Sequence, residues 1–425
     1  MMEKGNAVSA VPFNEGDIAW VAASTALVML MTPALAFFYG GLVRKKNLVS
    51  TLSQCLATFA VVSLIWMFWG YSLCFAPSVN SWGIIGNLSM IGMNNVTPST
   101  INGIYAKTIP EFLFFAFQLK FAAIAPALII GAFAERIRFR SLLIFVVLWS
   151  TVIYSPVAHW VWGDGGWLRS LGAVDFAGGI VVHITAGFTA LAASLVIGKR
   201  KDLGLREFKP NNIPYVVLGA GLLWFGWFGF NAGSALAANT VAVTALVTTN
   251  LAAAAGAVSW MAVDWSRKGK PSTVGIAVGA VCGLAAVTPA SGYVGLPAAV
   301  IIGLFAGIFA NLIGNWRASR LRFDDTLDVF ACHGISGLWG SLAVGLFASA
   351  AINPINGVNG LFFGNPHQFL VQVLAVAVIA VFSFLGSFVL LKVIDKITPL
   401  RVSPEEEEKG LDQSQHGEDA YSEED

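Results

Sequence analysis

Long apolar runs are the feature that most constrains this sequence. Runs of roughly 18 to 27 mostly apolar residues recur along the chain, and a helix needs about 20 such residues to cross the hydrocarbon core of a bilayer. Only helices and closed barrels satisfy all their backbone hydrogen bonds within lipid. Because the runs lack the period-two alternation of barrel strands, they predict membrane-spanning helices.

The composition agrees with a membrane protein. Charged residues make up 12% of the 425 residues, whereas soluble domains contain about 25%. The formal net charge of +1 indicates no particular partner, and basic residues spread over short loops do not predict nucleic-acid binding. The four cysteines show no spacing typical of a metal site or a disulfide framework. Residues 1–16 lack the pattern of a cleavable signal peptide.

We predict an all-α integral membrane protein with eleven transmembrane helices. The two spans on either side of Gly295 could be read as one long helix, but the Leu296-Pro297 step favours two. The predicted spans cover about residues 17–39, 50–76, 111–134, 141–163, 174–197, 213–236, 239–264, 274–293, 296–316, 327–351 and 368–394.

The distribution of basic residues predicts the orientation. Of the 25 lysines and arginines, 21 follow odd-numbered spans, counting the tail after the last span. Because cytoplasmic loops carry the excess of Lys and Arg, we place the N-terminus outside and the C-terminus in the cytoplasm, as an odd number of spans requires. Residues 1–16 are then a short extracytoplasmic segment, 17–394 the membrane domain and 395–425 a cytoplasmic tail.

Two histidines lie inside predicted spans. His183 is in the fifth span and His333 in the tenth. A single buried histidine is more often structural than functional, but polar groups within a membrane are costly and commonly functional. Two imidazoles on separate helices suit a polar pathway, because neutral imidazole both donates and accepts hydrogen bonds.

The positions of these histidines also suggest an internal repeat. If the spans form two groups of five, at about 17–197 and 213–351, the fifth and tenth spans are equivalent and the second group is inverted. Asp175 opens the fifth span and Asp328 the tenth. Transporters often place substrate sites between such repeats. Span eleven, 368–394, lies outside the repeat.

Aromatic residues form a second pattern. Phe117 and Phe121 share a face of the third span, while Trp227, Phe230 and Ser234 form one stripe on the sixth. Spacing alone favours lipid-facing rings and an interfacial belt. The functional alternative is a cation site at a pore mouth, where a ring face contributes about 0.5–2 kcal/mol.

Several ordered motifs resemble the Amt/Rh ammonium transporter family, in its Amt branch. The resemblance covers nearly the whole chain. It is carried by DFAGGIVVHITAG (175–187), FYGGLVRKKN (38–47), GAFAERIRF (131–139), AHWVWGDGGW (158–167), WFGFNAGSALAAN (227–239), DVFACHGISGLWG (328–340) and the tail LRVSPEEEEKGLDQSQHGEDAY (400–421).

The resemblance implies a role for each matching residue. The implied fold is two inverted five-helix repeats plus an eleventh helix, assembled as a homotrimer with one pore per subunit. The implied sites are ammonium recruitment by Trp162, Phe117, Ser234 and Asp175, a gate formed by Phe121 and Phe230, and a pore lined by His183, His333 and Trp227.

The resemblance also implies a function. We expect a multi-pass protein of the cell inner membrane that recruits ammonium, deprotonates it and conducts ammonia, with or without the proton. No enzymatic activity, cofactor or metal is expected. An ammonium sensor acting through a cytoplasmic partner is the alternative, and a PII-type signalling protein is an expected partner at the cytoplasmic face.

Other residues have structural alternatives. Asp175 is at least as well explained as a helix N-cap, and His159, His367 and His416 are expected to lie apart from conduction. Lys120 is a charge within a span for which the sequence names no partner.

The tail receives two different predictions. Its composition from residue 405 onward predicts a solvated, disordered segment. The resemblance instead predicts that 400–421 packs on the cytoplasmic face and couples neighbouring subunits, with only 422–425 free.

Overall fold

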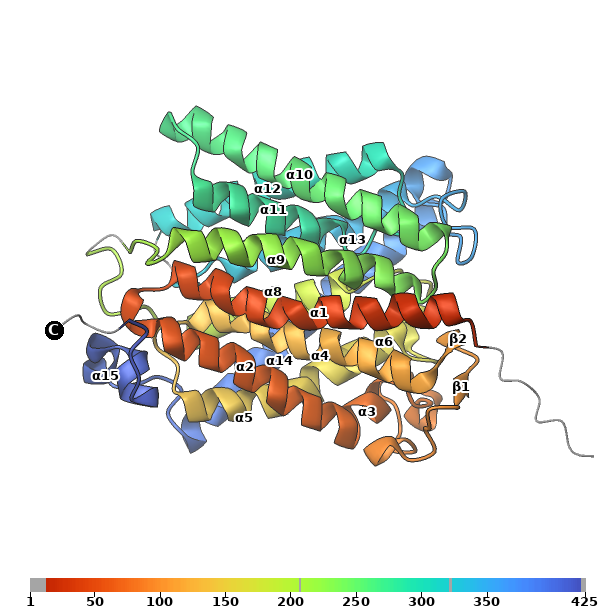
Figure 1. Ribbon diagram of the computed structural model, residues 1–425, viewed down its shortest axis with the longest axis horizontal. Helices are drawn as coiled ribbons and strands as arrows, with labels where there is room; N and C mark the ends of the chain where they lie inside the picture. The colour runs from red at the N-terminus through yellow and green to blue at the C-terminus, as the bar shows by residue number, and fades with distance from the viewer. Residues whose placement is uncertain (1–12, 206–207, 321–322, 422–425) are drawn as a thin grey trace, which may run out of the picture.

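The computed structural model describes residues 13–205, 208–320 and 323–421 and shows a bundle of long helices running side by side (Figure 1). Within those residues, ten helical segments are long and apolar enough to cross a membrane. They are Glu15–Leu42, Lys45–Phe75, Glu111–Phe133, Phe139–Ser170, Gly179–Ile197, Ile213–Ala235, Thr240–Lys268, Leu296–Arg320, Phe330–Phe347 and Pro366–Ile397.

The individual α-helices are shorter than some of these segments, because π-helical turns interrupt them. The α-helices are α1 (Glu15–Leu42), α2 (Leu48–Ile65), α3 (Tyr71–Phe75), α4 (Glu111–Phe133), α5 (Phe139–Trp149), α6 (Ser155–Trp162), α7 (Trp167–Ser170), α8 (Thr185–Ile197), α9 (Ile213–Ala232), α10 (Thr240–Lys268), α11 (Thr273–Val287), α12 (Leu296–Arg320), α13 (Ser336–Phe347), α14 (Pro366–Ile397) and α15 (Pro404–Lys409). A short antiparallel hairpin, β1 (Ile101–Asn102) with β2 (Ala106–Pro110), precedes α4.

The predicted eighth span differs from the others. It forms α11, whose 15 residues make it shorter than the ten long segments. Its C-terminal half, from Gly279 to Val287, is buried. A helix enclosed by other helices does not have to match the bilayer thickness with its own apolar length.

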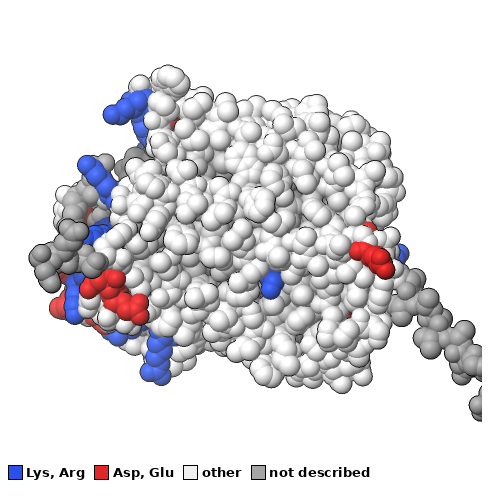
Figure 2. Space-filling model, in the orientation of Figure 1, with Lys and Arg blue, Asp and Glu red and all other residues white. Residues whose placement is uncertain are grey.

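The two ends of the bundle differ in charge. The described chain begins at one end, where α1 starts, and finishes at the opposite end near α15 (Figure 1). Figure 2 shows a nearly uncharged side surface, with basic and acidic residues gathered mainly at the end that carries α15. Residues 1–12 of the predicted external segment and 422–425 of the tail lie outside the described residues.

The tail packs on the bundle as far as Tyr421, so the disorder predicted from its composition is wrong for this stretch. Ser403 and Glu406 form a capping box at the start of α15. Asp412 accepts hydrogen bonds from the backbone N–H groups of Val49 (3.1 Å) and Ser50 (2.7 Å), at the first turn of α2. These contacts use the acidic side chains as helix caps, which composition alone does not reveal.

A buried ion network connects the loops at this end. The Arg136 guanidinium is fully buried and donates to the backbone oxygen of Asp324, and Nε of Arg200 lies 2.8 Å from Oδ2 of Asp324. Burial lowers the pKa of Arg136 to about 10. Burial also acts to raise the pKa of Asp324, but Arg136 and Arg200 outweigh it and hold that pKa at about 2.

The fifth and tenth spans cross closely at glycines. Each begins with a π-helical turn, Gly179–Ile184 before α8 and Phe330–Ile335 before α13. A Cβ atom added to Gly187 would lie 2.1 Å from the backbone nitrogen of Gly334, and one added to Gly337 would lie 2.9 Å from Cβ of His183. Only glycine permits this separation of the two backbones.

Replacing Gly187 by alanine should therefore destabilise the protein. The added methyl group meets backbone, so the helices must separate, at a cost of about 1–3 kcal/mol. The midpoint of thermal unfolding in detergent measures this loss. Gly221→Ala is the matched control, because a Cβ atom there meets nothing within 4 Å and alanine favours the helix by about 1 kcal/mol. Equal effects of the two variants would contradict the crossing.

Asp324→Asn should also be destabilising, by about 3–5 kcal/mol, because it leaves buried arginines without their counter-charge. A carboxyl whose folded pKa lies below its unfolded value stabilises at pH values above the unfolded pKa, and this contribution is lost as the pH falls toward 2. The stability difference from wild type should thus be constant between about pH 5 and 8 and shrink below about pH 4.

Glu408→Gln is the control for this prediction. The Lys201–Glu408 pair is largely exposed, and exposed ion pairs contribute little to stability because water screens them. A D324N effect as small as that of E408Q would show that the network does not stabilise the fold.

Candidate functional site

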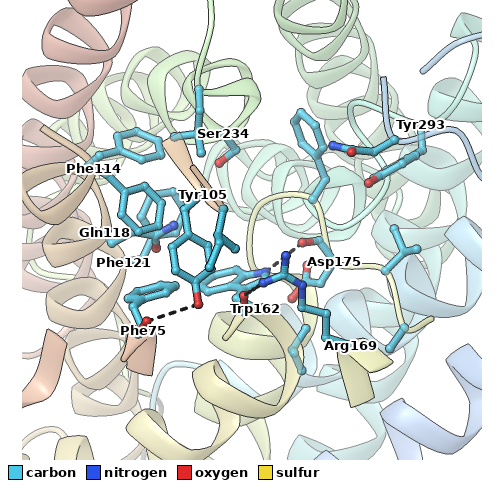
Figure 3. A pocket seen from close by; sticks show the side chains of 18 residues that line it. Phe75, Tyr105, Phe114, Gln118, Phe121, Trp162, Arg169, Asp175, Ser234 and Tyr293 are labelled. Carbon is cyan, nitrogen blue, oxygen red and sulfur yellow. Dashed lines mark hydrogen bonds between the residues drawn. The ribbon is translucent and has the colours of Figure 1, made fainter. Parts of the chain in front are cut away.

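A cavity of about 310 Å³, which we call the outer cavity, is lined by residues next to the β-hairpin (Figure 3), and the hairpin lies at the end of the bundle where α1 begins (Figure 1). Segments far apart in the sequence line it. All four residues predicted to recruit ammonium, and one of the two gate residues, are among its lining: Phe117, Trp162, Asp175, Ser234 and Phe121.

Hydrogen bonds fix two of the polar side chains that line this cavity. The indole Nε1 of Trp162 donates to the backbone oxygen of Asp175 at 2.9 Å, which sets the plane of the ring. The hydroxyl of Ser234 donates to the backbone oxygen of Phe230 at 2.8 Å. Because its only proton is used in this bond, the Ser234 oxygen can only accept from a molecule in the cavity.

Asp175 caps the helix that follows it. One carboxylate oxygen accepts from the backbone N–H groups of Gly178 (2.9 Å) and Gly179 (2.7 Å), and the other accepts from Ile180 and Val181 (2.9 Å each). The helix-cap alternative for this residue is thus confirmed. Its carboxylate is directed at the start of the fifth span, while its backbone oxygen holds Trp162.

A stacked phenylalanine pair closes the bottom of the outer cavity. The rings of Phe121 and Phe230 have centroids 4.2 Å apart and planes inclined by 31°. Phe121 lines the outer cavity and Phe230 lines a second, inner cavity. Both rings are almost fully buried. The pair therefore separates the two cavities.

The inner cavity is narrow and contains both histidines. Its volume of about 10 Å³ leaves room for roughly one water-sized molecule. Nδ1 of His333 lies 3.3 Å from Nδ1 of His183, and the two rings are nearly parallel, inclined by 14°. One nitrogen must donate and the other accept, so the two imidazoles share one proton at this contact. The remaining lining is apolar apart from Trp227.

Trp227 supports one face of this pair. Its ring is stacked on His183, with centroids 5.4 Å apart and an angle of 21°. Its indole nitrogen donates to the hydroxyl of Thr288 at 2.9 Å. Because that N–H group is already bonded, Trp227 presents mainly an apolar surface to the cavity. The structure therefore brings all nine predicted site residues to two adjoining cavities.

The two spans that carry the histidines share the same spacing of an aspartate, a histidine and a glycine. Asp325 accepts from the backbone N–H groups of Val329 (3.1 Å) and Phe330 (2.7 Å), and so caps the tenth span. An aspartate thus stands eight residues before each histidine, and a glycine at the crossing stands four after it: Asp175, His183 and Gly187 in one span, and Asp325, His333 and Gly337 in the other.

The prediction that Asp328 is the equivalent of Asp175 in the tenth span was therefore wrong. Asp328 is paired with Arg317 at 2.6 Å instead. The equal spacing of eight residues from each histidine was the signal that could have identified Asp325.

Sequence reasoning missed the residues that loops and a short helix bring to the outer cavity. Tyr105 and Asn356 come from segments outside the long helices, Arg169 lies in the four-residue helix α7, and Tyr293 follows α11. Helical periodicity contains no information about such positions. Arg169 had one available signal, as one of few basic residues predicted on the outer side.

The remaining singled-out residues lie apart from the cavities. His159 is hydrogen-bonded through both ring nitrogens, to the Cys74 backbone oxygen and the Ser78 hydroxyl, as a structural residue would be. The Lys120 ammonium lies 5.1 Å from the ring centroid of Phe59 on α2. Among the described residues, no group of three His, Cys, Asp or Glu side chains could hold a metal ion.

Comparisons with known proteins agree with this geometry. A sequence model of the Ammonium Transporter Family matches residues 19–421. Ammonium transporter Amt1 of Archaeoglobus fulgidus is 47% identical over 410 residues, which cover 96% of this chain and 100% of that protein. The ammonium transporter of Bacillus subtilis is also 47% identical over 410 residues, covering 96% and 98%.

Solved structures share the fold. The crystal structure of Saccharomyces cerevisiae Mep2 matches with a TM-score of 0.87 at 36% identity, covering 93% of this chain and 89% of that one. A structure described as a Sensor Amt Protein matches with a TM-score of 0.86 at 30% identity, covering 94% and 98%. By sequence and by fold, the chain belongs to the ammonium transporter family.

Proposed function

We propose that this protein recruits ammonium in the outer cavity, deprotonates it at the Phe121–Phe230 pair and conducts ammonia past His183 and His333. The observation that carries the proposal is the order of the two cavities. A wide cavity with polar groups is followed by a stacked ring pair and then by a narrow apolar cavity with two linked histidines.

The outer cavity suits a cation. Phe117 and Trp162 both lie beside Phe121, with ring centroids 5.0 and 6.0 Å from its own. Ring faces attract a monovalent cation by about 0.5–2 kcal/mol. The Ser234 oxygen, which can only accept, adds a hydrogen bond that ammonium can donate.

The inner cavity suits a neutral molecule. It holds about one water-sized particle and its walls are largely apolar, so a cation there would lose its hydration without compensation. Born estimates of that cost are tens of kcal/mol, and a group that can release its proton does so instead. Ammonium can become ammonia in this way, whereas sodium and potassium ions have no neutral form.

The histidine pair offers ammonia hydrogen bonds in place of those that it loses when it leaves water. The second nitrogen of His183, Nε2, is buried and has no hydrogen-bond partner among the described residues. An unbonded polar atom in an apolar cavity is costly unless a mobile molecule satisfies it. Whether the released proton also crosses, along the imidazoles, decides between net ammonium transport and passive ammonia conduction.

The architecture that we propose has eleven spans, with the N-terminus outside and the C-terminus in the cytoplasm of a cell whose inner membrane holds the protein. α11 serves as the eighth span. The opposite positions of the chain ends and the charged end beside α15 support this orientation (Figures 1 and 2). The repeated aspartate, histidine and glycine spacing supports two inverted five-helix repeats. A homotrimer with one pore per subunit completes the proposal.

Sensing is the second candidate function. The likeness to a structure described as a Sensor Amt Protein favours it, and the ordered tail offers a surface beside α2 for a cytoplasmic partner such as a PII-type protein. Rapid substrate flux would separate a transporter from a protein that only senses. Ammonium transporters are not enzymes, and the proposal includes no catalytic reaction.

Ammonium pulses on sealed proteoliposomes test conduction directly. A transient inward positive current would mean net ammonium transport, while internal alkalinisation without current would mean ammonia conduction. Either signal should fall by about tenfold or more in a His183→Ala, His333→Ala double variant, because both hydrogen-bonding side chains are lost. His367→Ala is the control, since that side chain is exposed and outside both cavities. If folded protein gave neither signal, conduction would be abandoned in favour of sensing.

Ion selectivity tests the role of the apolar inner cavity. His183→Glu introduces a carboxylate that can compensate a cation, so potassium should begin to carry current through the variant. His183→Gln, which is polar but uncharged, should continue to exclude potassium. Potassium and ammonium currents measured on the same proteoliposomes give the ratio. Discrimination against potassium that is unchanged in H183E would count against the proposal.

A further inference from the structure

The charge balance of the outer cavity is unexpected for a site that receives a cation. Arg169 is the one basic residue and Asp175 the one acidic residue among the described residues that line it. All four hydrogen bonds of the Asp175 carboxylate go to the start of the fifth span. The negative charge is therefore partly compensated by the helix N-terminus, while the positive charge remains at the mouth.

Two contacts hold Arg169 at this position. Nη1 donates to the backbone oxygen of Trp162 at 2.7 Å, and the guanidinium carbon lies 5.5 Å from the ring centroid of Tyr105. Figure 3 shows Arg169 extending beside Trp162 and Asp175 at the edge of the cavity. The side chain is thus fixed next to one of the aromatic rings that we assign to the cation site.

The neighbouring titratable groups do not cancel this charge. Burial raises the pKa of Tyr105 to about 12, so this phenol is neutral at physiological pH. His159 is hydrogen-bonded within the bundle and does not line the cavity. Asp164 also lies outside the lining, and no ion pair joins it to Arg169 among the described residues.

We propose that Arg169 is a specificity-determining residue of the outer cavity, whose positive charge disfavours every bound cation and thereby favours the neutral form of a substrate that can release a proton. This inference rests on the proposed function. It assigns a role to a residue outside the ring pair and the histidines.

The cations differ in how they respond to repulsion by Arg169. Like charges a few ångströms apart repel, and the repulsion is larger in a partly enclosed cavity than in bulk water. Ammonium escapes it by transferring a proton to solvent water in the outer cavity, and enters the inner cavity as ammonia. Potassium and sodium ions have no proton to release, so they do not enter the inner cavity and dissociate from the outer cavity again. The arginine thus weakens binding of all cations while it promotes the step that only ammonium can take.

The test is the ionic-strength dependence of transport by Arg169→Gln. In proteoliposomes at low ionic strength, the KM for ammonium and the maximal rate should both fall about two- to fivefold, because the cation binds more tightly and releases its proton less readily. Added N-methylglucamine chloride should reduce the difference in KM from wild type, since salt screens an exposed charge. Inhibition by potassium should strengthen by a similar factor.

Two variants serve as controls. Arg169→Lys keeps the charge and should retain the wild-type salt dependence. Lys107→Gln removes another exposed cation at the same end of the bundle, in β2 and outside the cavity, and should leave KM unchanged.

The outcomes separate this inference from the proposed function. A higher KM in both R169Q and R169K, with no change in salt dependence, would mean that Arg169 only holds the Trp162 backbone, and would overturn the inference. An R169Q variant identical to a conducting wild type would do the same. A folded wild type without any flux would overturn the proposed function, and the inference with it.

Discussion

The site depends on the close crossing of the fifth and tenth spans. Gly187 lies against the backbone of Gly334, and Gly337 lies against His183. Any side chain at these positions would separate the helices by more than the 3.3 Å contact between the two histidine rings can tolerate. The absence of two Cβ atoms therefore produces the histidine pair, and the histidine pair defines the inner cavity. In the proposed function, the outer cavity contributes to selection of ammonium only because the narrow inner cavity follows it.

The treatment of charge follows from the same arrangement. Inside the bundle, the two carboxylates nearest the histidine spans, Asp175 and Asp325, are bonded to backbone N–H groups. At the end near the tail, the buried arginines share Asp324. These buried charges are thus compensated, in accordance with their high desolvation cost. The charge of Arg169, which is exposed at the outer cavity, is available to interact with a solute.

Much of the fold and site followed from the sequence, for identifiable reasons. Ten of the predicted spans correspond to long apolar helices because bilayer thickness sets their length, and the motifs identified nine residues that line the two cavities. Other features have no local signature. The length of α11 depends on its neighbours, and Arg169 reaches the cavity only through the packing of the short helix α7. Helical periodicity also could not reveal the π-helical turns that carry both histidines, although such turns are frequent at functional sites.

The tail shows how a composition rule can fail when partners are specific. Glu406, Glu407 and Asp412 belong to a segment whose acidity is typical of disorder. Each has a defined partner: Arg138 at 3.0 Å, Arg401 at 2.7 Å and the first turn of α2. Composition averages over these pairings, whereas order depends on whether each charge meets a complementary group on a rigid surface. The same bundle that encloses the cavities provides that surface, so displacement of the tail by a partner would also uncover the N-terminus of α2, which follows the C-terminal end of α1, a helix that lines the inner cavity.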